Sequence, residues 1–125
     1  AITLVLAMAC ASGAARARTL EALMLIATDL APASSAIFYT SMELPGDEAA
    51  KKFFEARFVT YCGHVDRRLA DSEYLAGALS IADFALYPTW APRKALLDGK
   101  GYKHLERWGA AMGTRAAVVR GAQLA

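Results

Sequence analysis

The side chains able to perform nucleophilic or metal chemistry are few and widely spaced. Cys10 and Cys62 form no Cys-x-x-Cys pair, and the two histidines are His64 and His104. Disulfide frameworks and structural zinc sites need several such ligands at short spacing, so the sequence predicts neither. Both cysteines lie in apolar stretches with helical spacing, where a free thiol is commonly buried. We therefore predict no metal site and expect two reduced, buried thiols, in keeping with a cytoplasmic protein.

Acid–base and nucleophilic catalysis also lack a recognisable arrangement. Cys62 and His64 are two positions apart, which places their side chains on different faces of a helix. Asp47 and Glu48 are adjacent, but they fit the start of a helix better than an acid–base pair. The sequence has no glycine-rich phosphate loop and no nucleophile elbow. The residues by themselves therefore predict no catalytic residue in this chain.

Composition indicates that helices position these side chains. The chain has 125 residues, 56% of them hydrophobic, and alanine is far more abundant than valine and isoleucine together. Alanine is the best helix former and β-branched residues favour strands, so the composition predicts one all-α domain. The formal net charge of +2 is too small to indicate electrostatic binding to nucleic acid or to a membrane surface. We expect neither partner.

The first half of the chain predicts two long helices. Apolar residues recur at three- and four-residue spacing over 16–42, which indicates one long helix bent at Pro32. Asp47 is placed to cap a second helix, whose outer side carries charges of alternating sign. Such a charged side is typical of a face in contact with water.

The second half begins with a clear local motif. Ser80 and Asp83 have the types and spacing of a capping box, in which each side chain binds the backbone near the other residue. The helix that starts here is expected to continue to Leu97, with bends at its prolines. A shorter helix over 102–112 and a final turn over 114–120 complete an expected bundle of five to six helices.

Three segments, in order, resemble the helical C-terminal domain of glutathione transferases. Residues 75–83, LAGALSIAD, resemble the signature of that domain, which contains the same capping box. Residues 18–30 resemble its first long helix, especially in bacterial beta-type members. Residues 105–118 resemble its closing segment, although Ala116 stands where proline is usual. The resemblance covers roughly residues 14–122 and implies a glutathione transferase C-terminal-like helical bundle.

The same resemblance gives an interpretation of the apolar start of the chain. Residues 1–12 resemble the end of the last helix of a thioredoxin-like domain, and residues 13–125 correspond to the helical domain. The apolar run also resembles the core of a signal peptide, but it lacks a basic leading segment and is shorter than the ~20 apolar residues of a membrane span. The interpretation as a stub of a larger protein is therefore favoured over a secreted helical protein.

The resemblance assigns roles to seven residues. They are Thr28 and Asp29 for glutathione, Ser34, Phe38 and Trp90 for an apolar co-substrate pocket, and Ser80 and Asp83 for the structural capping box. The alternative for Phe38 and Trp90 is an ordinary core or interface position. Met24 and Ala31 depart from the Asn and His of beta-type relatives.

These roles lead to one principal hypothesis. The chain is expected to be the acceptor-substrate and dimerisation domain of a glutathione transferase-like protein, which conjugates glutathione to hydrophobic electrophiles in bacterial detoxification. The group that activates the thiol belongs to a thioredoxin-like domain absent from this chain, so the chain alone is expected to be inactive. Glutathione is then a co-substrate, and no bound cofactor is expected. Expected partners are a second copy or that missing domain, together with a hydrophobic small molecule. The alternative is a non-catalytic dimerisation or docking module of the same fold.

Overall fold

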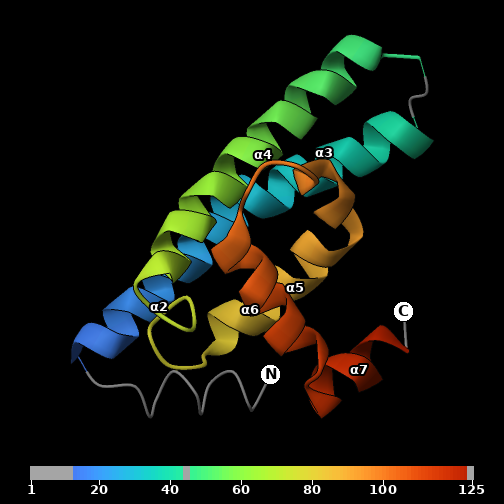
Figure 1. Ribbon diagram of the computed structural model, residues 1–125. Coiled ribbons are helices and arrows are strands. Elements are labelled where there is room, and N and C mark those ends of the chain that lie inside the picture. Colours follow the sequence, from blue (N-terminus) through green and yellow to red (C-terminus); the bar gives the residue numbers. More distant parts are fainter. Residues whose placement is uncertain (1–12, 44–45, 124–125) are drawn as a thin grey trace.

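The protein is an all-helical bundle, in which a loop of ten residues separates α4 from α5 (Figure 1). The structure is a computed structural model and describes residues 13–43 and 46–123. The predictions for the stub over 1–12 and for Cys10 therefore lie outside the described residues. In order, the elements are α2 (Gly13–Leu25), η1 (Ile26–Leu30), α3 (Ala31–Met42), α4 (Glu48–Ala70), α5 (Ile81–Trp90), η2 (Ala91–Leu97), α6 (Lys103–Gly113) and α7 (Ala116–Ala122). The described residues contain no strand, which confirms the all-α prediction.

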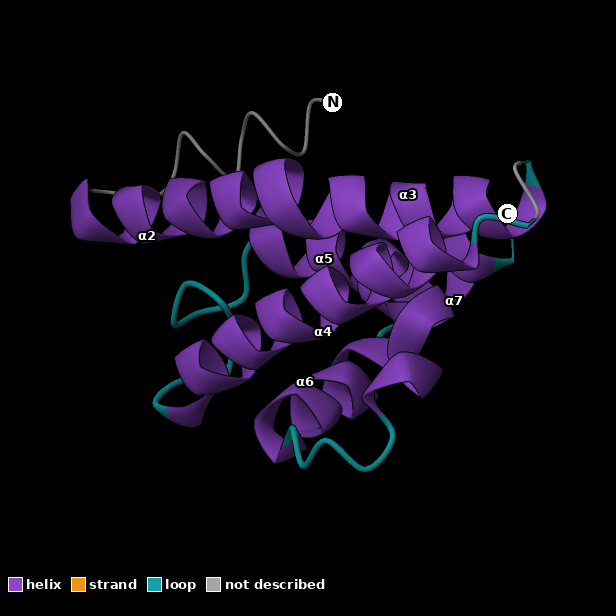
Figure 2. Ribbon diagram, turned by 90° about the horizontal axis from the view of Figure 1, so that it is seen from above, coloured by secondary structure: helices purple, strands orange, loops and turns teal. Residues whose placement is uncertain are grey.

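The first three elements form a single helix from Gly13 to Met42. Its middle part, Ile26–Leu30, is a π-helical turn, in which the N–H of Ala31 donates to the carbonyl of Ile26. Pro32 follows directly and has no N–H to continue the regular ladder, so a wider turn before it accommodates the ring. The three segments run in nearly one line (Figure 2). The predicted long helix is confirmed, and a π turn takes the place of the expected bend.

The long helix packs lengthwise against the rest of the bundle. It forms an antiparallel pair with α4, and α5 and α6 complete the other side of the core (Figure 1). By length and apolar composition alone, the helix from Gly13 to Met42 would suffice to cross a membrane. Its residues Ala22, Ile26 and Leu30 are instead buried in the protein core. The core of a helical bundle thus explains part of this apolar character.

Helix ends follow the capping signals of the sequence. The side chain of Asp47 accepts a hydrogen bond from the N–H of Ala50 at 2.9 Å, as expected for the start of α4. At the start of α5, Ser80 Oγ accepts from the N–H of Ala82 at 3.3 Å, and Asp83 Oδ2 accepts from the N–H of Ser80 at 2.9 Å. The predicted capping box is therefore confirmed. The prolines beyond it lead into a 3₁₀ segment that ends at Leu97.

A second carboxylate caps a helix from a distance. Asp66, near the C-terminal end of α4, accepts hydrogen bonds from the N–H groups of His104 and Leu105, both at 2.9 Å. These are first-turn groups of α6, which have no partner within their own helix. Because the cap comes from another helix, it fixes the start of α6 against α4.

Candidate functional site

The two residues predicted to contact glutathione lie in the π turn. Thr28 is exposed, and its hydroxyl donates to the carbonyl of Met24 at 2.8 Å. Asp29 is half-buried, and within the described ranges its carboxylate has no hydrogen-bond or ion-pair partner. π turns are frequent at functional sites. Asp29 is therefore available to an ammonium group, whereas Thr28 is already engaged with its own helix.

The residues predicted to form an apolar pocket are not all brought together. Ser34 joins two helices, because its hydroxyl donates to the carbonyl of Thr89 at 3.3 Å and its own carbonyl accepts from Arg93 Nη2 at 3.3 Å. Phe38 is 45% exposed on the outside of α3. Its ring meets that of Tyr39 edge-on, with 5.6 Å between centroids. Ser34 thus connects α3 to α5, and Phe38 remains open to solvent.

Trp90 belongs to the core. The side chain is 8% exposed, and its ring centroid lies 5.9 Å from that of Tyr87 and 5.7 Å from that of Trp108. A Cβ placed on Gly109 would come within 2.2 Å of the Trp90 ring, so only glycine fits there without movement. The cavity that Trp90 lines does not include Ser34 or Phe38. That these three residues line one acceptor pocket stays a prediction.

A larger apolar groove lies between α5 and α7. Its volume is about 470 Å³, within the range of small-molecule sites. The residues that line it are mostly apolar: Phe84, Tyr87, Pro88, Ala91, Pro92, Ala117, Val118, Gly121 and Ala122. The sequence reasoning did not single out this groove. One pattern in the sequence could have indicated the groove. Apolar residues recur at helical spacing along the outer side of the capped helix, at Phe84, Pro88 and Ala91, and such a face needs a neighbour to cover it.

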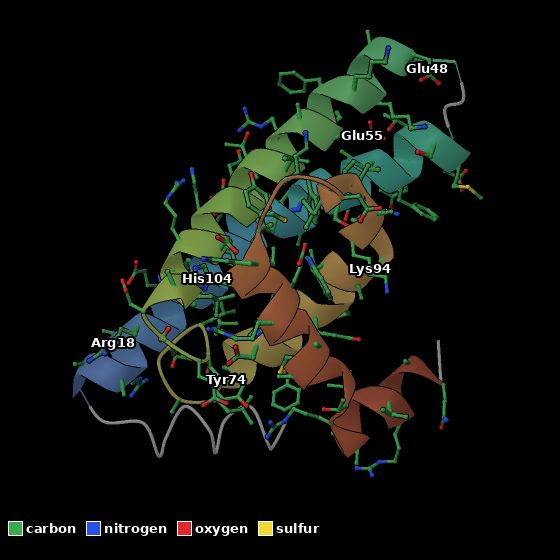
Figure 3. The ribbon with its side chains drawn as sticks, viewed as in Figure 1. Arg18, Glu48, Glu55, Tyr74, Lys94 and His104 are labelled. Carbon is green, nitrogen blue, oxygen red and sulfur yellow. The ribbon has the colours of Figure 1, made fainter. Side chains whose placement is uncertain are left out.

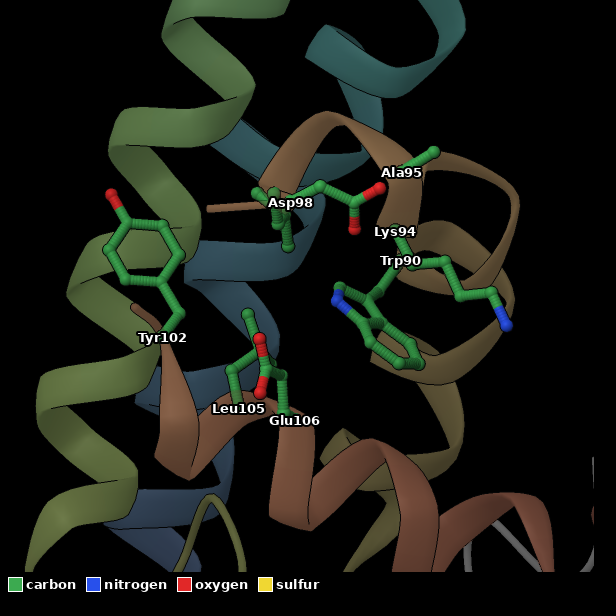
Figure 4. A pocket seen from close by; sticks show the side chains of 8 residues that line it. Trp90, Lys94, Ala95, Asp98, Tyr102, Leu105 and Glu106 are labelled. Carbon is green, nitrogen blue, oxygen red and sulfur yellow. The ribbon is translucent and has the colours of Figure 1, made fainter. Parts of the chain in front are cut away.

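A smaller cavity opens beside Trp90, between η2 and the start of α6 (Figure 4). Its volume is about 300 Å³. Aromatic and aliphatic side chains share its lining with three charged residues, Lys94, Asp98 and Glu106. None of these three was singled out from the sequence, because only the packing of η2 against α6 brings them together.

The chemistry-bearing residues of the sequence do not form a catalytic pair. Cys62 is 1% exposed, and burial raises the pKa of its thiol from 9.0 to about 12. It is therefore a protonated, poorly nucleophilic thiol at neutral pH. His64 is exposed, and His104 lies beside α4 where α6 begins (Figure 3). The buried state predicted for Cys62 is confirmed. Among the described residues, no group of three or more potential ligands is arranged to hold a metal ion.

Solved glutathione transferases share this fold. One from Pseudomonas putida, with glutathione disulfide bound, has a TM-score of 0.75 at 24% identity over 86% of this chain and 51% of that chain. One from poplar has a TM-score of 0.80 at 17% identity over 91% of this chain and 56% of that one. One from Phanerochaete chrysosporium, in complex with oxidised glutathione, has a TM-score of 0.80 at 19% identity over 91% and 55%. No protein-family model and no curated protein matches the sequence.

These likenesses define the fold. The chain spans about half the length of the matched structures, and its described part is helical without strands. It has the fold of the helical domain of glutathione transferases, which confirms the predicted fold class. Fold alone does not carry an activity, which must be argued from the site.

Proposed function

We propose that this chain is the acceptor-binding helical domain of a glutathione transferase-like protein, whose parent reaction joins glutathione to hydrophobic electrophiles. The fold supports this proposal, as do the structural neighbours from Pseudomonas putida and Phanerochaete chrysosporium that hold glutathione disulfide. The observation that carries it is the apolar groove between α5 and α7, which has the size and lining of a site for a hydrophobic small molecule.

The long helix from Gly13 to Met42 carries exposed apolar side chains, which indicate that another protein surface packs against it. Four large apolar side chains, here called the outer apolar face, are exposed by 39%, 57%, 45% and 66%: Leu20, Met24, Phe38 and Met42. Apolar groups clustered on a surface commonly mark an interface. In the proposed assembly, this face packs on a thioredoxin-like domain that binds glutathione, or on a second copy of the chain.

The π turn contributes the polar contact of the proposed assembly. Asp29 offers a carboxylate without a partner among the described residues, and an ammonium group of glutathione is a suitable ion for it. The described chain offers no activated thiol or base, since Cys62 is buried and protonated. Activation of the glutathione thiol is therefore assigned to the partner domain, and we expect no conjugation by the 125 residues alone.

The groove is tested by binding of a neutral fluorescent probe, N-phenyl-1-naphthylamine, to the full chain. We expect a single class of sites, from which the hydrophobic electrophile 1-chloro-2,4-dinitrobenzene displaces the probe. Ala117 and Ala116 are neighbouring exposed residues of α7, but only Ala117 lines the groove. Ala117→Arg should weaken probe binding about tenfold or more, which corresponds to ~1.4 kcal/mol. Ala116→Arg is the matched control and should bind as the parent chain does.

Two results would contradict the proposal. Equal weakening by both alanine variants would place the probe outside the groove. Conjugation of glutathione by the purified chain, at rates well above the uncatalysed reaction, would show that a thiol-activating group lies in this chain after all.

The second candidate function is a non-catalytic docking or dimerisation module. The outer apolar face favours it, since that face needs a protein partner whether or not glutathione binds. Light scattering at micromolar concentration measures whether the chain is a monomer or a dimer. A dimer that Met24→Lys converts to a monomer supports self-association through this face. A monomeric parent chain removes the main reason for that function.

The finer assignments complete the proposal. Residues 18–30 resemble the bacterial beta-type members, and we assign the parent protein to that type. A cytoplasmic location accords with the reduced, buried Cys62. Detoxification is the role that the proposed reaction would serve.

A further inference from the structure

The two tryptophans of the core differ in whether the indole N–H has a hydrogen-bond acceptor. Their rings meet edge-on with centroids 5.7 Å apart. The indole Nε1–H of Trp108 donates to Asp83 Oδ1 at 2.9 Å. The indole nitrogen of Trp90 is buried as well, yet it has no hydrogen-bond acceptor among the described residues. Buried donors are nearly always paired in folded proteins, so an unpaired one asks for an explanation.

The unpaired nitrogen faces the cavity between η2 and α6. Figure 4 shows it on the side of the ring that is turned toward Tyr102 and the first turn of α6, with the cavity between them. The carboxylates of Asp98 and Glu106 face the same space, whereas the Lys94 side chain extends away from it. Asp98 and Glu106 are exposed, so their side chains can rotate to admit a ligand. The cavity thus presents one buried donor and two negative charges.

The walls of this cavity are held in place from behind. The Trp90 ring lies on Gly109, where a Cβ would come within 2.2 Å of it. Tyr102 lies on Gly63 in the same way: its hydroxyl is 2.8 Å from the point that a Cβ on Gly63 would occupy, and it donates to the carbonyl of Val59 at 3.3 Å. Because glycine has no side chain, Trp90 can pack closely on α6 at Gly109, and Tyr102 can pack closely on α4 at Gly63. The space between the two rings therefore stays open.

We propose that this cavity binds a small organic monocation that carries a neutral acceptor oxygen, as an amino-acid amide or an amino ketone does. The ammonium group lies between the carboxylates of Asp98 and Glu106, where a charge-assisted bond to each is available. The oxygen accepts the hydrogen bond that Trp90 Nε1–H lacks. The apolar part of the ligand lies against Leu97 and Leu105, which line the cavity. A volume of about 300 Å³ limits the ligand to a single small residue or its equivalent.

This site is separate from the proposed function. The cavity shares no lining residue with the groove between α5 and α7. Its occupant is a cation, whereas the proposed acceptor of the groove is an apolar electrophile. Failure of either proposal leaves the other unaffected.

Three related probes separate the contributions of charge and acceptor. Leucinamide carries an ammonium group and a carbonyl, isoamylamine lacks the carbonyl, and N-acetylleucinamide lacks the charge. The readout is the pair of indole N–H signals in ¹H–¹⁵N NMR spectra of the full chain, one from Trp90 and one from Trp108. We expect leucinamide to shift the Trp90 signal and to leave the Trp108 signal in place. Isoamylamine should bind about tenfold more weakly, and N-acetylleucinamide should not bind.

A matched pair of double variants tests the acidic residues. Asp98→Asn with Glu106→Gln removes both charges of the cavity and should weaken leucinamide binding about tenfold or more. Asp71→Asn with Glu73→Gln removes two charges from exposed positions in the loop after α4 and should leave binding unchanged. The proposal is overturned if leucinamide leaves the Trp90 signal unmoved, if all three probes bind equally, or if the two double variants bind alike.

Trp90→Phe tests the donor itself. This variant keeps a ring on Gly109 and removes the N–H, so leucinamide should lose its preference over isoamylamine. Far-ultraviolet circular dichroism verifies that the variant folds. If it does not fold, the shift of the Trp90 signal in the parent chain still decides the proposal. A folded variant that retains the full preference would contradict it.

Discussion

The carboxylate of Asp83 and the indole of Trp108 are joined by a hydrogen bond of 2.9 Å in the centre of the bundle. Asp83 is fully buried, and its carboxylate also accepts from the N–H and the hydroxyl of Ser80 and, at 3.1 Å, from the N–H of Leu75. One side chain therefore starts α5, holds the preceding loop and orients α6. The capping box of this fold is also a tertiary junction.

Replacement of Asp83 by alanine should be among the most damaging single changes. It leaves three N–H groups without their acceptor: the buried ones of the Trp108 indole and Leu75, and the part-buried one of Ser80. The cost is ~1–3 kcal/mol for each group that water does not reach. We expect a loss of about 3 kcal/mol or more in the free energy of unfolding, measured by urea titration. Ser80→Ala removes only the local cap and should cost ~1 kcal/mol. Equal effects of the two substitutions would contradict the junction role.

Much of this fold was predictable from local signals. Asp47 and the Ser80–Asp83 pair act on residues three positions away, so their capping roles are visible in the sequence. The apolar period of residues 16–42 likewise indicated the long helix. The bond from Trp108 to Asp83 was not predictable in this way, since it depends on how α6 packs on α5.

The candidate sites were less predictable for the same reason. The resemblance pointed to Ser34, Phe38 and Trp90, yet Ser34 is occupied by a bond to Thr89 and Trp90 is packed in the core. The groove and the cavity described above form where separate helices meet, α5 with α7 and η2 with α6, and Trp90 lines the second of them. The apolar repeat at Phe84, Pro88 and Ala91 indicates that this face of α5 needs a cover, but it does not indicate that α7 provides it.

The glycine behind Trp90 should not tolerate a side chain. Gly109→Ala places a methyl group within 2.2 Å of the Trp90 ring. The ring must move, and overpacking of this kind typically costs ~1–3 kcal/mol. Urea titration followed by tryptophan fluorescence measures both the loss and the changed surroundings of the indole. Gly121→Ala is the control, because within the described part of the chain no atom beyond its neighbours and its own helix backbone lies within 4 Å of the point that its Cβ would occupy. It should be neutral or stabilise α7 by up to ~1 kcal/mol.

Asp66, which caps α6 from α4, should contribute to stability through its hydrogen bonds to two backbone N–H groups. Asp66→Ala leaves the N–H groups of His104 and Leu105 without their shared acceptor, which lies 2.9 Å from each. We expect a loss of ~1–2 kcal/mol in the free energy of unfolding, as for other helix caps. Asp71→Ala, an exposed position at the end of α4, should change stability by less than ~0.5 kcal/mol. If both variants unfold at the same urea concentration, Asp66 does not act as a cap.

The buried Cys62 should make the protein less stable at alkaline pH. Burial raises the pKa of its thiol from 9.0 to about 12. Between these values the unfolded chain loses the proton while the folded protein retains it. The unfolded state then binds fewer protons, so the free energy of unfolding falls as the pH rises above 9.0, and this contribution is fully present only below that pH. The free energy of unfolding should fall less steeply with pH in Cys62→Ala than in the parent protein. Urea titrations of both proteins at several pH values above 9.0 measure this difference.

Alkylation gives an independent measurement on the same thiol. Native protein treated with iodoacetamide at mildly alkaline pH should leave the peptide that contains Cys62 unmodified, since the side chain is 1% exposed and protonated. The same peptide should be alkylated rapidly in concentrated urea, where the thiol regains its ordinary pKa. Mass spectrometry of the digested protein reads both states. Equal labelling in the two conditions would mean that the thiol is accessible in the folded protein, and the alkaline loss of stability would then need another cause.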